Sequence, residues 1–178
     1  MLLTFIHRNF RSKGKLLFLL AAFVLNAFKP GPEGNEYQIK AMFIFNFTKY
    51  VEWPDVTDEG VFTIGVIGES EIMDPLEKIA VQKKVGEKKI VVKKMSMDDA
   101  NACNIIIVSK SRVNKLDQVE KNFAGKGVLI ISDESPRSAA INLVTRDNKV
   151  RFEINPSLAR NGGVKISSQL LALAIAVH

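Results

Sequence analysis

Two short, continuous runs of apolar residues constrain the fold of this chain more than any other feature. The runs are NIIIVS (104–109) and VLIISD (128–133). Continuous apolar runs of this kind are typical of strands buried on both faces, which occur in parallel sheets covered by helices. VFTIGVIG (61–68) and KKIVVKKM (88–95) predict two further strands. A parallel sheet of at least four strands is therefore the expected centre of the fold.

The segments between these runs have the spacing of helices. LEKIAVQKKV (76–85), preceded by the capping pair Asp74-Pro75, and VNKLDQVEKNF (113–123) predict amphipathic helices, and DDANA (98–102) predicts a short helix or turn. The resulting order β-α-β-(α)-β-α-β predicts a mostly parallel sheet with helices on both faces. With 178 residues in total, we expect an α/β fold of three α/β/α layers in a single domain.

The segment before the first predicted strand is ambiguous in its periodicity. EYQIKAMFIFNFTKYVEW (36–53) alternates like a strand at its phenylalanines but also repeats like a helix. We favour a helix because the segment is long for a strand and contains no Gly or Pro. Trp53-Pro54 is expected to end it, since proline disfavours helical geometry in the preceding residue.

The last third of the chain has a different pattern. AAINLVTRDNKVRFEIN (139–155) alternates on either side of Asp147-Asn148, which predicts a β-hairpin with its turn at that pair. Asn155-Pro156 is expected to open a short helix that ends at Gly162 and Gly163. Ser167 or Ser168 then caps SQLLALAIAVH (168–178), a segment so apolar that we expect a buried helix.

The N-terminal segment has the layout of a secretory signal. Residues 1–27 contain four Lys or Arg and no Asp or Glu, and an apolar run of thirteen residues (16–28) precedes a turn-rich stretch. Such a run spans about 20 Å as a helix, less than the roughly 30 Å of a bilayer core. We expect a signal peptide over 1–27, a linker over 28–36 and a periplasmic domain over 37–178 with no stable membrane insertion after cleavage. An uncleaved anchor is the alternative.

Composition argues against most kinds of catalytic or metal site. The chain has one cysteine and two histidines, and the histidines are residues 7 and 178. A zinc site with two thiolates is excluded, and a histidine-based nucleophilic pair in the body of the domain is disfavoured. The acidic pairs 58–59, 98–99 and 133–134 are adjacent in sequence and fall in turns. We therefore expect no enzyme and no cofactor.

The net charge of +6 does not point to nucleic acid, because four of these positive charges lie in residues 1–27. A cluster of lysines brackets the strand at 88–95 without interleaved aromatic residues. It consists of Lys83, Lys84, Lys88, Lys89, Lys93 and Lys94. A solvated sheet edge explains this cluster, and contact with anionic lipid headgroups or an acidic partner surface is the alternative.

Three groups of residues are candidates for contact with a partner or ligand. Tyr50 and Trp53 could be an aromatic anchor or part of the core. Polar or small residues end three strands, and ligands of open α/β sheets collect at such ends; they are Gly68, Glu69, Ser109, Lys110 and Asp133. The third group lies on or just after the last strand of the hairpin and could be a charged contact surface or an ordinary solvated face; it comprises Arg151, Glu153 and Asn155.

Several stretches together resemble the YfiR family of small exported bacterial proteins. They are YQIKAMFIFNFTKYVEWP (37–54), FTIGVIG (62–68), CNIIIVS (103–109), VLIISD (128–133), INLVTRDNKVRFEIN (141–155) and VKISSQLLALA (164–174). The resemblance implies one α/β domain that acts outside the cytoplasm as a repressor of a membrane-bound diguanylate cyclase and couples envelope conditions to cyclic-di-GMP output. The type member is tuned by disulfides, whereas this sequence has Cys103 alone. A switch based on an internal disulfide cannot operate here.

Two functions follow from these observations. The first is a regulator that binds and represses a membrane-anchored signalling protein, either a diguanylate cyclase or a sensor kinase. The second is a periplasmic small-ligand-binding or sensor domain that uses the crevice at the carboxyl ends of the strands. A second copy of the chain is a further candidate partner.

Overall fold

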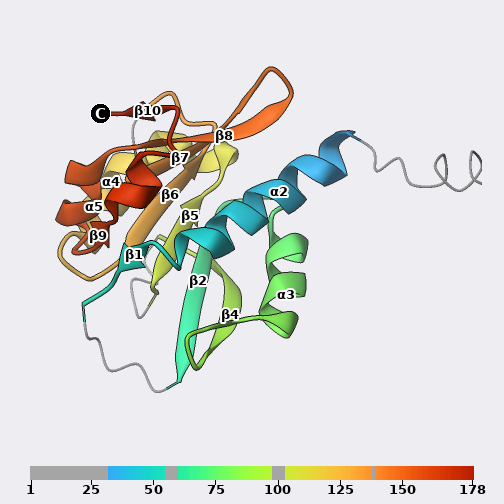
Figure 1. Ribbon diagram of the computed structural model, residues 1–178, viewed down its shortest axis with the longest axis horizontal. Helices are drawn as coiled ribbons and strands as arrows, with labels where there is room; N and C mark the ends of the chain where they lie inside the picture. The colour runs from blue at the N-terminus through green and yellow to red at the C-terminus, as the bar shows by residue number, and fades with distance from the viewer. Residues whose placement is uncertain (1–31, 55–59, 98–102, 138) are drawn as a thin grey trace, which may run out of the picture. The chain divides into compact units, whose positions relative to one another are not determined.

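The computed structural model describes residues 32–54, 60–97, 103–137 and 139–178. Within these residues, eight strands form one mixed, mostly parallel sheet (Figure 1). In spatial order the strands are β10 (Ala176–Val177), β8 (Lys149–Ile154), β7 (Ile141–Arg146), β6 (Leu129–Asp133), β5 (Ile105–Val108), β2 (Val61–Ile67), β4 (Lys88–Met95) and β3 (Lys84–Val85). The five strands from β7 to β4 run parallel, which confirms the predicted fold class.

Helices cover both faces of this sheet. They are α2 (Pro32–Phe47), α3 (Met73–Gln82), the 3-10 helix η1 (Lys110–Lys115), α4 (Leu116–Phe123), α5 (Pro156–Asn161) and α6 (Ser168–Leu171). A separate two-stranded sheet pairs β1 (Val51–Glu52) with β9 (Lys165–Ile166) in antiparallel register. The predicted signal segment and the predicted short helix at 98–102 lie outside the described residues.

The sheet separates two hydrophobic clusters because successive side chains of a strand point to opposite faces. In β5, Ile105 and Ile107 pack in the cluster beneath α2 and α3, whereas Ile106 and Val108 pack in the cluster beneath α4. Both faces of the central strands are therefore buried, as their continuous apolar sequences predicted. This pattern gives the three layers of the expected fold.

The hairpin and the caps of the C-terminal third match the sequence prediction. β7 and β8 pair antiparallel up to Arg146 and Lys149, and the two turn residues Asp147 and Asn148 have φ of 50° and 58°. Both values belong to the left-handed region that a tight two-residue hairpin turn requires. The Asn155 side chain accepts hydrogen bonds from the backbone N–H groups of Ser157 and Leu158 at the start of α5.

The predicted buried helix over residues 168–178 is wrong. Only α6 is helical, capped by Ser167, and the chain then forms β10 beside β8 at the edge of the sheet. Ile175 donates its backbone N–H to the carbonyl of Phe152, so strand pairing replaces the helical hydrogen bonds. The apolar composition indicated burial, but one side of an edge strand has no neighbour. Three apolar side chains of this segment, Leu173, Ile175 and Val177, remain exposed.

The boundaries of three predicted helices also differ from the structure. α2 begins at Pro32, within the expected linker, and ends at Phe47, six residues before Trp53. Ile72 is the N-cap residue of α3, so Asp74-Pro75 lies in the first turn instead of before it. The segment expected as one helix over 113–123 starts as the 3-10 helix η1 and becomes α4 at Leu116.

Candidate functional site

The carboxyl ends of β2 and β4, together with the segment after β5, surround a crevice of about 470 Å³. Gly68 and Glu69 follow β2, Lys94 and Met95 end β4, and Arg112 comes from the segment after β5. Gly68, Glu69 and Ser109 are among the strand-end candidates of the sequence. The structure places the Ser109 side chain against Gly68 and adds the side chains of Ser111 and Arg112.

Gly68 is the residue that lets these segments approach one another. Its φ of +92° lies in the region that favours glycine. A Cβ atom at this position would collide with the side chains of Ser109, Ser111 and Arg112. The Ser109 and Ser111 hydroxyl oxygens lie 2.8 Å apart, and Ser111 Oγ lies 3.4 Å from the Glu69 carbonyl oxygen.

The charged side chains of Glu69, Lys94 and Arg112 lie at the rim of the crevice. Lys94 forms an ion pair with Glu69, and both side chains are largely exposed. The hydrogen bond from Lys94, together with its positive charge, lowers the pKa of Glu69, and the charge of Arg112 lowers it further. The Glu69 carboxylate therefore remains ionised and partly neutralises the two cations of the rim.

Asp133, the third strand-end residue in the prediction, belongs to a separate buried polar cluster. Its Oδ1 lies 2.6 Å from the Nζ of Lys40, and the two side chains are only 2% and 1% exposed. Lys40 Nζ also lies 2.6 Å from Glu36 Oε1 and 3.9 Å from Glu134 Oε1. Lys110 is not among the described residues that line the strand-end crevice. Burial by itself raises the pKa of Glu36, but hydrogen bonds from Lys40 and Thr145 and the positive charges of Lys40 and Lys110 outweigh that effect, and the pKa is lowered.

Lys40 keeps its positive charge in this environment. Burial by itself lowers the pKa of Lys40, but the hydrogen bonds to Asp133 and Glu36 and their negative charges outweigh that effect, and its pKa is raised. The sequence analysis missed Lys40. A signal was present, because Lys40 precedes Ile44 and Phe47 by four and seven residues and so lies on the buried face of α2.

Tyr50 and Trp53 pack against the core. Trp53 Nε1 donates a hydrogen bond of 3.0 Å to the backbone carbonyl oxygen of Asn104. Its ring packs edge-on against Phe62, with 5.2 Å between the centroids. Tyr50 is half-buried against the same cluster. These contacts favour a core role for the pair, one of the two readings that the sequence left open.

The candidates on and after the last hairpin strand do not form one polar patch. Glu153 Oε2 accepts a hydrogen bond of 3.2 Å from the side-chain amide of Asn142. Arg151 is exposed, and its register partner on β7 is Val144. Asn155 has a structural role as the N-cap of α5.

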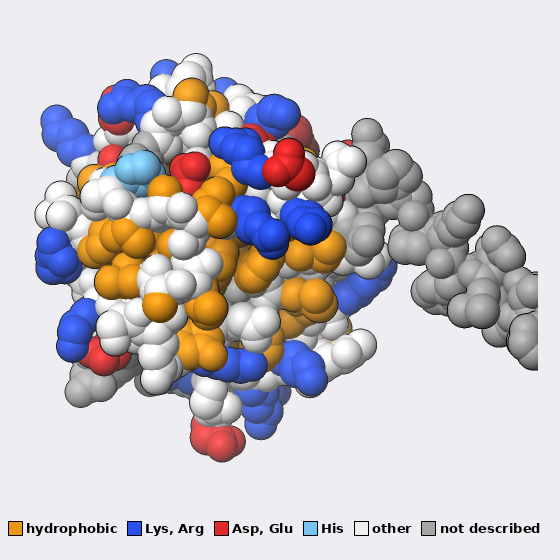
Figure 2. Space-filling view, turned by 45° about the horizontal axis from the view of Figure 1, so that its top comes forward, with side chains coloured by type: hydrophobic (Ala, Val, Ile, Leu, Met, Phe, Trp, Pro, Cys, Tyr) orange, Lys and Arg blue, Asp and Glu red, His pale blue; other side chains and the backbone are white. Residues whose placement is uncertain are grey.

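Exposed apolar side chains lie along the C-terminal segment. Leu173, Ile175 and Val177 are 63%, 48% and 52% exposed, and their alternate spacing suits one side of an extended segment. Figure 2 shows hydrophobic side chains gathered on one face of the molecule, with Lys and Arg side chains around them. We call Leu173, Ile175 and Val177 the apolar face. The sequence analysis missed it because it assigned residues 168–178 to a buried helix.

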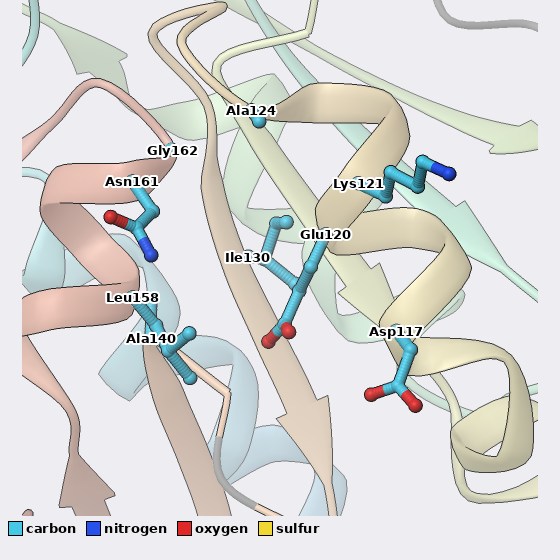
Figure 3. A pocket seen from close by; sticks show the side chains of 9 residues that line it. All are labelled: Asp117, Glu120, Lys121, Ala124, Ile130, Ala140, Leu158, Asn161 and Gly162. Carbon is cyan, nitrogen blue, oxygen red and sulfur yellow. The ribbon is translucent and has the colours of Figure 1, made fainter.

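A second groove of about 420 Å³ lies between α4 and α5 (Figure 3). The Glu120 carboxylate points into it from α4, above the apolar side chains of Ile130 and Ala140. Glu120 Oε1 is enclosed and has no hydrogen-bond partner within the described part of the chain. Burial raises the pKa of Glu120, and the nearby Asp117 raises it further.

The lysine-rich strand lies at one edge of the sheet, as the solvated-edge interpretation predicts. β3 has two residues, and Lys84 pairs with Lys89 of β4. Lys89, Lys93 and Lys94 are exposed. Charged side chains at a sheet edge oppose pairing with strands of other molecules.

Cys103 is buried, and its thiol donates a hydrogen bond of 3.0 Å to Met95 Sδ. Among the residues described by the structure, no group of three or more His, Cys, Asp or Glu side chains could hold a metal ion. The described helices include none that is both long and apolar enough to cross a membrane.

The family model for YfiR/HmsC-like proteins matches residues 37–175. The chain belongs to this family. The match runs from the first turns of α2 to the residue before β10, and it includes the hairpin and every parallel strand from β2 to β7. The YfiR/HmsC-like family is a regulatory family. Among curated proteins, none matches the sequence.

Proposed function

We propose that this protein is an exported regulator that binds and represses a membrane-anchored signalling enzyme of the diguanylate cyclase type. The observation that carries the proposal is the YfiR/HmsC-like match over residues 37–175, because the family is known for periplasmic repressors of such a cyclase. The basic and apolar layout of residues 1–27 supports export to the periplasm.

The apolar face is the proposed contact with the partner. Large apolar side chains that remain exposed together mark interaction surfaces, since their burial by a partner is favourable. Burying one such side chain contributes about 1.5–3 kcal/mol. The packing of Tyr50 and Trp53 against the core makes them weaker candidates than Leu173 and Ile175.

Leu173→Asp and Ile175→Asp test this assignment. The experiment reconstitutes a full-length membrane-anchored diguanylate cyclase as the candidate partner and measures cyclic-di-GMP synthesis as this protein is added. Wild type should repress synthesis, and each variant should need about tenfold or more protein for the same effect. Val81→Asp is the matched control, because Val81 is an 88% exposed apolar residue on α3, outside the apolar face.

Two outcomes would contradict the proposal. If wild-type protein neither binds the cyclase nor lowers cyclic-di-GMP synthesis, the proposed repressor function is wrong. If the Leu173→Asp and Ile175→Asp variants fold and repress as well as Val81→Asp, the apolar face is not the contact with the cyclase. If these variants instead converted a dimer to a monomer with unchanged repression, the apolar face would serve self-association, and sedimentation velocity would detect that change.

A further inference from the structure

The crevice at the ends of β2 and β4 lies where open α/β sheets bind ligands. The chain passes from β2 to β4 on one side of β2 and then returns to β5 on the other side. The strand order therefore reverses around β2. At such a reversal, the connections after β2 and β5 leave the carboxyl ends of these neighbouring strands in opposite directions and a crevice opens between them. The crevice is lined by residues after both strands, as well as by the end of β4.

The lining of the crevice combines cations, a hydroxyl group and an apolar floor. Arg112 and Lys94 provide the positive charges, Ser111 provides the hydroxyl group, and Ile67 and Met95 provide apolar surface. An arginine guanidinium presents paired N–H donors that match the oxygens of a phosphate. The apolar side chains provide contact area for an organic group attached to it.

The close packing at Gly68 holds these groups at one place. With no side chain of its own, Gly68 leaves room for the Arg112 stem and the Ser111 hydroxyl beside its Cα atom. Arg112 also donates its backbone N–H to the carbonyl oxygen of Ser109, at 2.8 Å, which fixes the turn that carries both side chains. The stem of Arg112 and the Ser111 hydroxyl are thus placed beside the strand end before any ligand arrives.

We propose that this crevice binds a small organic phosphate, with Arg112, Lys94 and Ser111 on the phosphate and Met95 against the organic group. Lys94 exchanges its ion pair with Glu69 for the ligand's phosphate. Among the lining residues that the structure describes, Glu69 is the acidic one, and its charge opposes anion binding. The site goes beyond the proposed repressor function and does not depend on it, since the apolar face involves other residues.

Phenyl phosphate is the probe, titrated into the purified ¹⁵N-labelled protein with the amide resonances of Gly68, Ser111 and Arg112 as readout. We expect saturable shifts at these three amides. Inorganic phosphate should bind more weakly because it lacks the ring, and phenol should not shift these amides. Three outcomes would each overturn the proposal. Phenol could shift these amides as much as phenyl phosphate does, benzoate could bind more tightly than phenyl phosphate, or phenyl phosphate could shift only amides elsewhere in the protein.

Two substitutions with opposite expected effects separate a binding role from a structural one. Arg112→Met keeps the stem beside Gly68 but removes the guanidinium, and it should weaken phenyl phosphate binding about tenfold or more. Glu69→Gln removes the opposing charge and should tighten binding about two- to fivefold. Arg137→Met is the matched control, an exposed arginine paired with Asp117 outside this crevice. Equal weakening by Arg112→Met and Arg137→Met would show non-specific attraction and overturn the proposal, as would unchanged affinity in Glu69→Gln.

Discussion

Lys40 connects α2 to the end of β6 through a buried ion pair. Removal of one partner from such a pair leaves the other charge buried without compensation. Lys40→Met should therefore lower the free energy of unfolding by about 3–5 kcal/mol. Urea denaturation measures this change. Lys49→Met, in the turn that follows α2, is the control, because Lys49 is exposed and its loss should cost less than about 0.5 kcal/mol. Similar stabilities of the two variants would contradict the role assigned to Lys40.

Glu120 should affect stability in a pH-dependent way. Burial, with a further contribution from Asp117, raises its folded pKa above the ordinary 4.5. The folded protein thus holds this proton more tightly than the unfolded chain does. Stability is then lost as pH rises from that ordinary value through the folded pKa. Glu120→Gln cannot ionise, so its thermal midpoint should exceed that of wild type at about pH 7 and lose this advantage at about pH 4. A constant difference across this range would contradict the explanation.

The β7–β8 hairpin shows how a local pattern predicts an element. Asp147 and Asn148 both adopt positive φ, a conformation in which glycine is less strained than asparagine. Asn148→Gly should therefore raise the free energy of unfolding by a few tenths to about 1 kcal/mol. Chemical denaturation of the variant and of wild type gives this difference. Destabilisation by Asn148→Gly would mean that the Asn148 side chain makes a contribution larger than the backbone strain.

Elements with local signals were predictable from sequence, and elements that depend on distant partners were not. The buried strands, the hairpin turn and the Asn155 cap each have their signal within a few residues. Residues 168–178 have an apolar pattern that fits a buried helix, but the open edge of β8, distant in sequence, makes part of that segment a strand. The sequence grouped Asp133 with the other strand-end candidates, yet Asp133 pairs with Lys40, because α2 places a lysine over β6.

The whole described domain has two hydrophobic clusters that share one sheet. Because β2, β5 and β6 contribute side chains to both clusters, neither cluster can unfold while the other keeps these strands intact. Phe152→Ala and Phe123→Ala each remove a buried ring from a different cluster, and each should lower stability by about 3–5 kcal/mol. Thermal unfolding followed by far-UV and near-UV circular dichroism should give one coincident transition for both variants. Separate transitions would show that the clusters are independent.

The position of Cys103 gives the protein an internal reporter of its own opening. It is the single cysteine of the sequence, and its sulfur is enclosed beside Met95 at the start of the β5 segment. Because the thiol is buried, a thiol-reactive dye can reach that sulfur only when the structure around it opens. The labelling rate therefore measures how often the folded protein opens, and no cysteine has to be introduced for the measurement. Any ligand or partner that prefers the closed form should slow this rate in proportion to its occupancy.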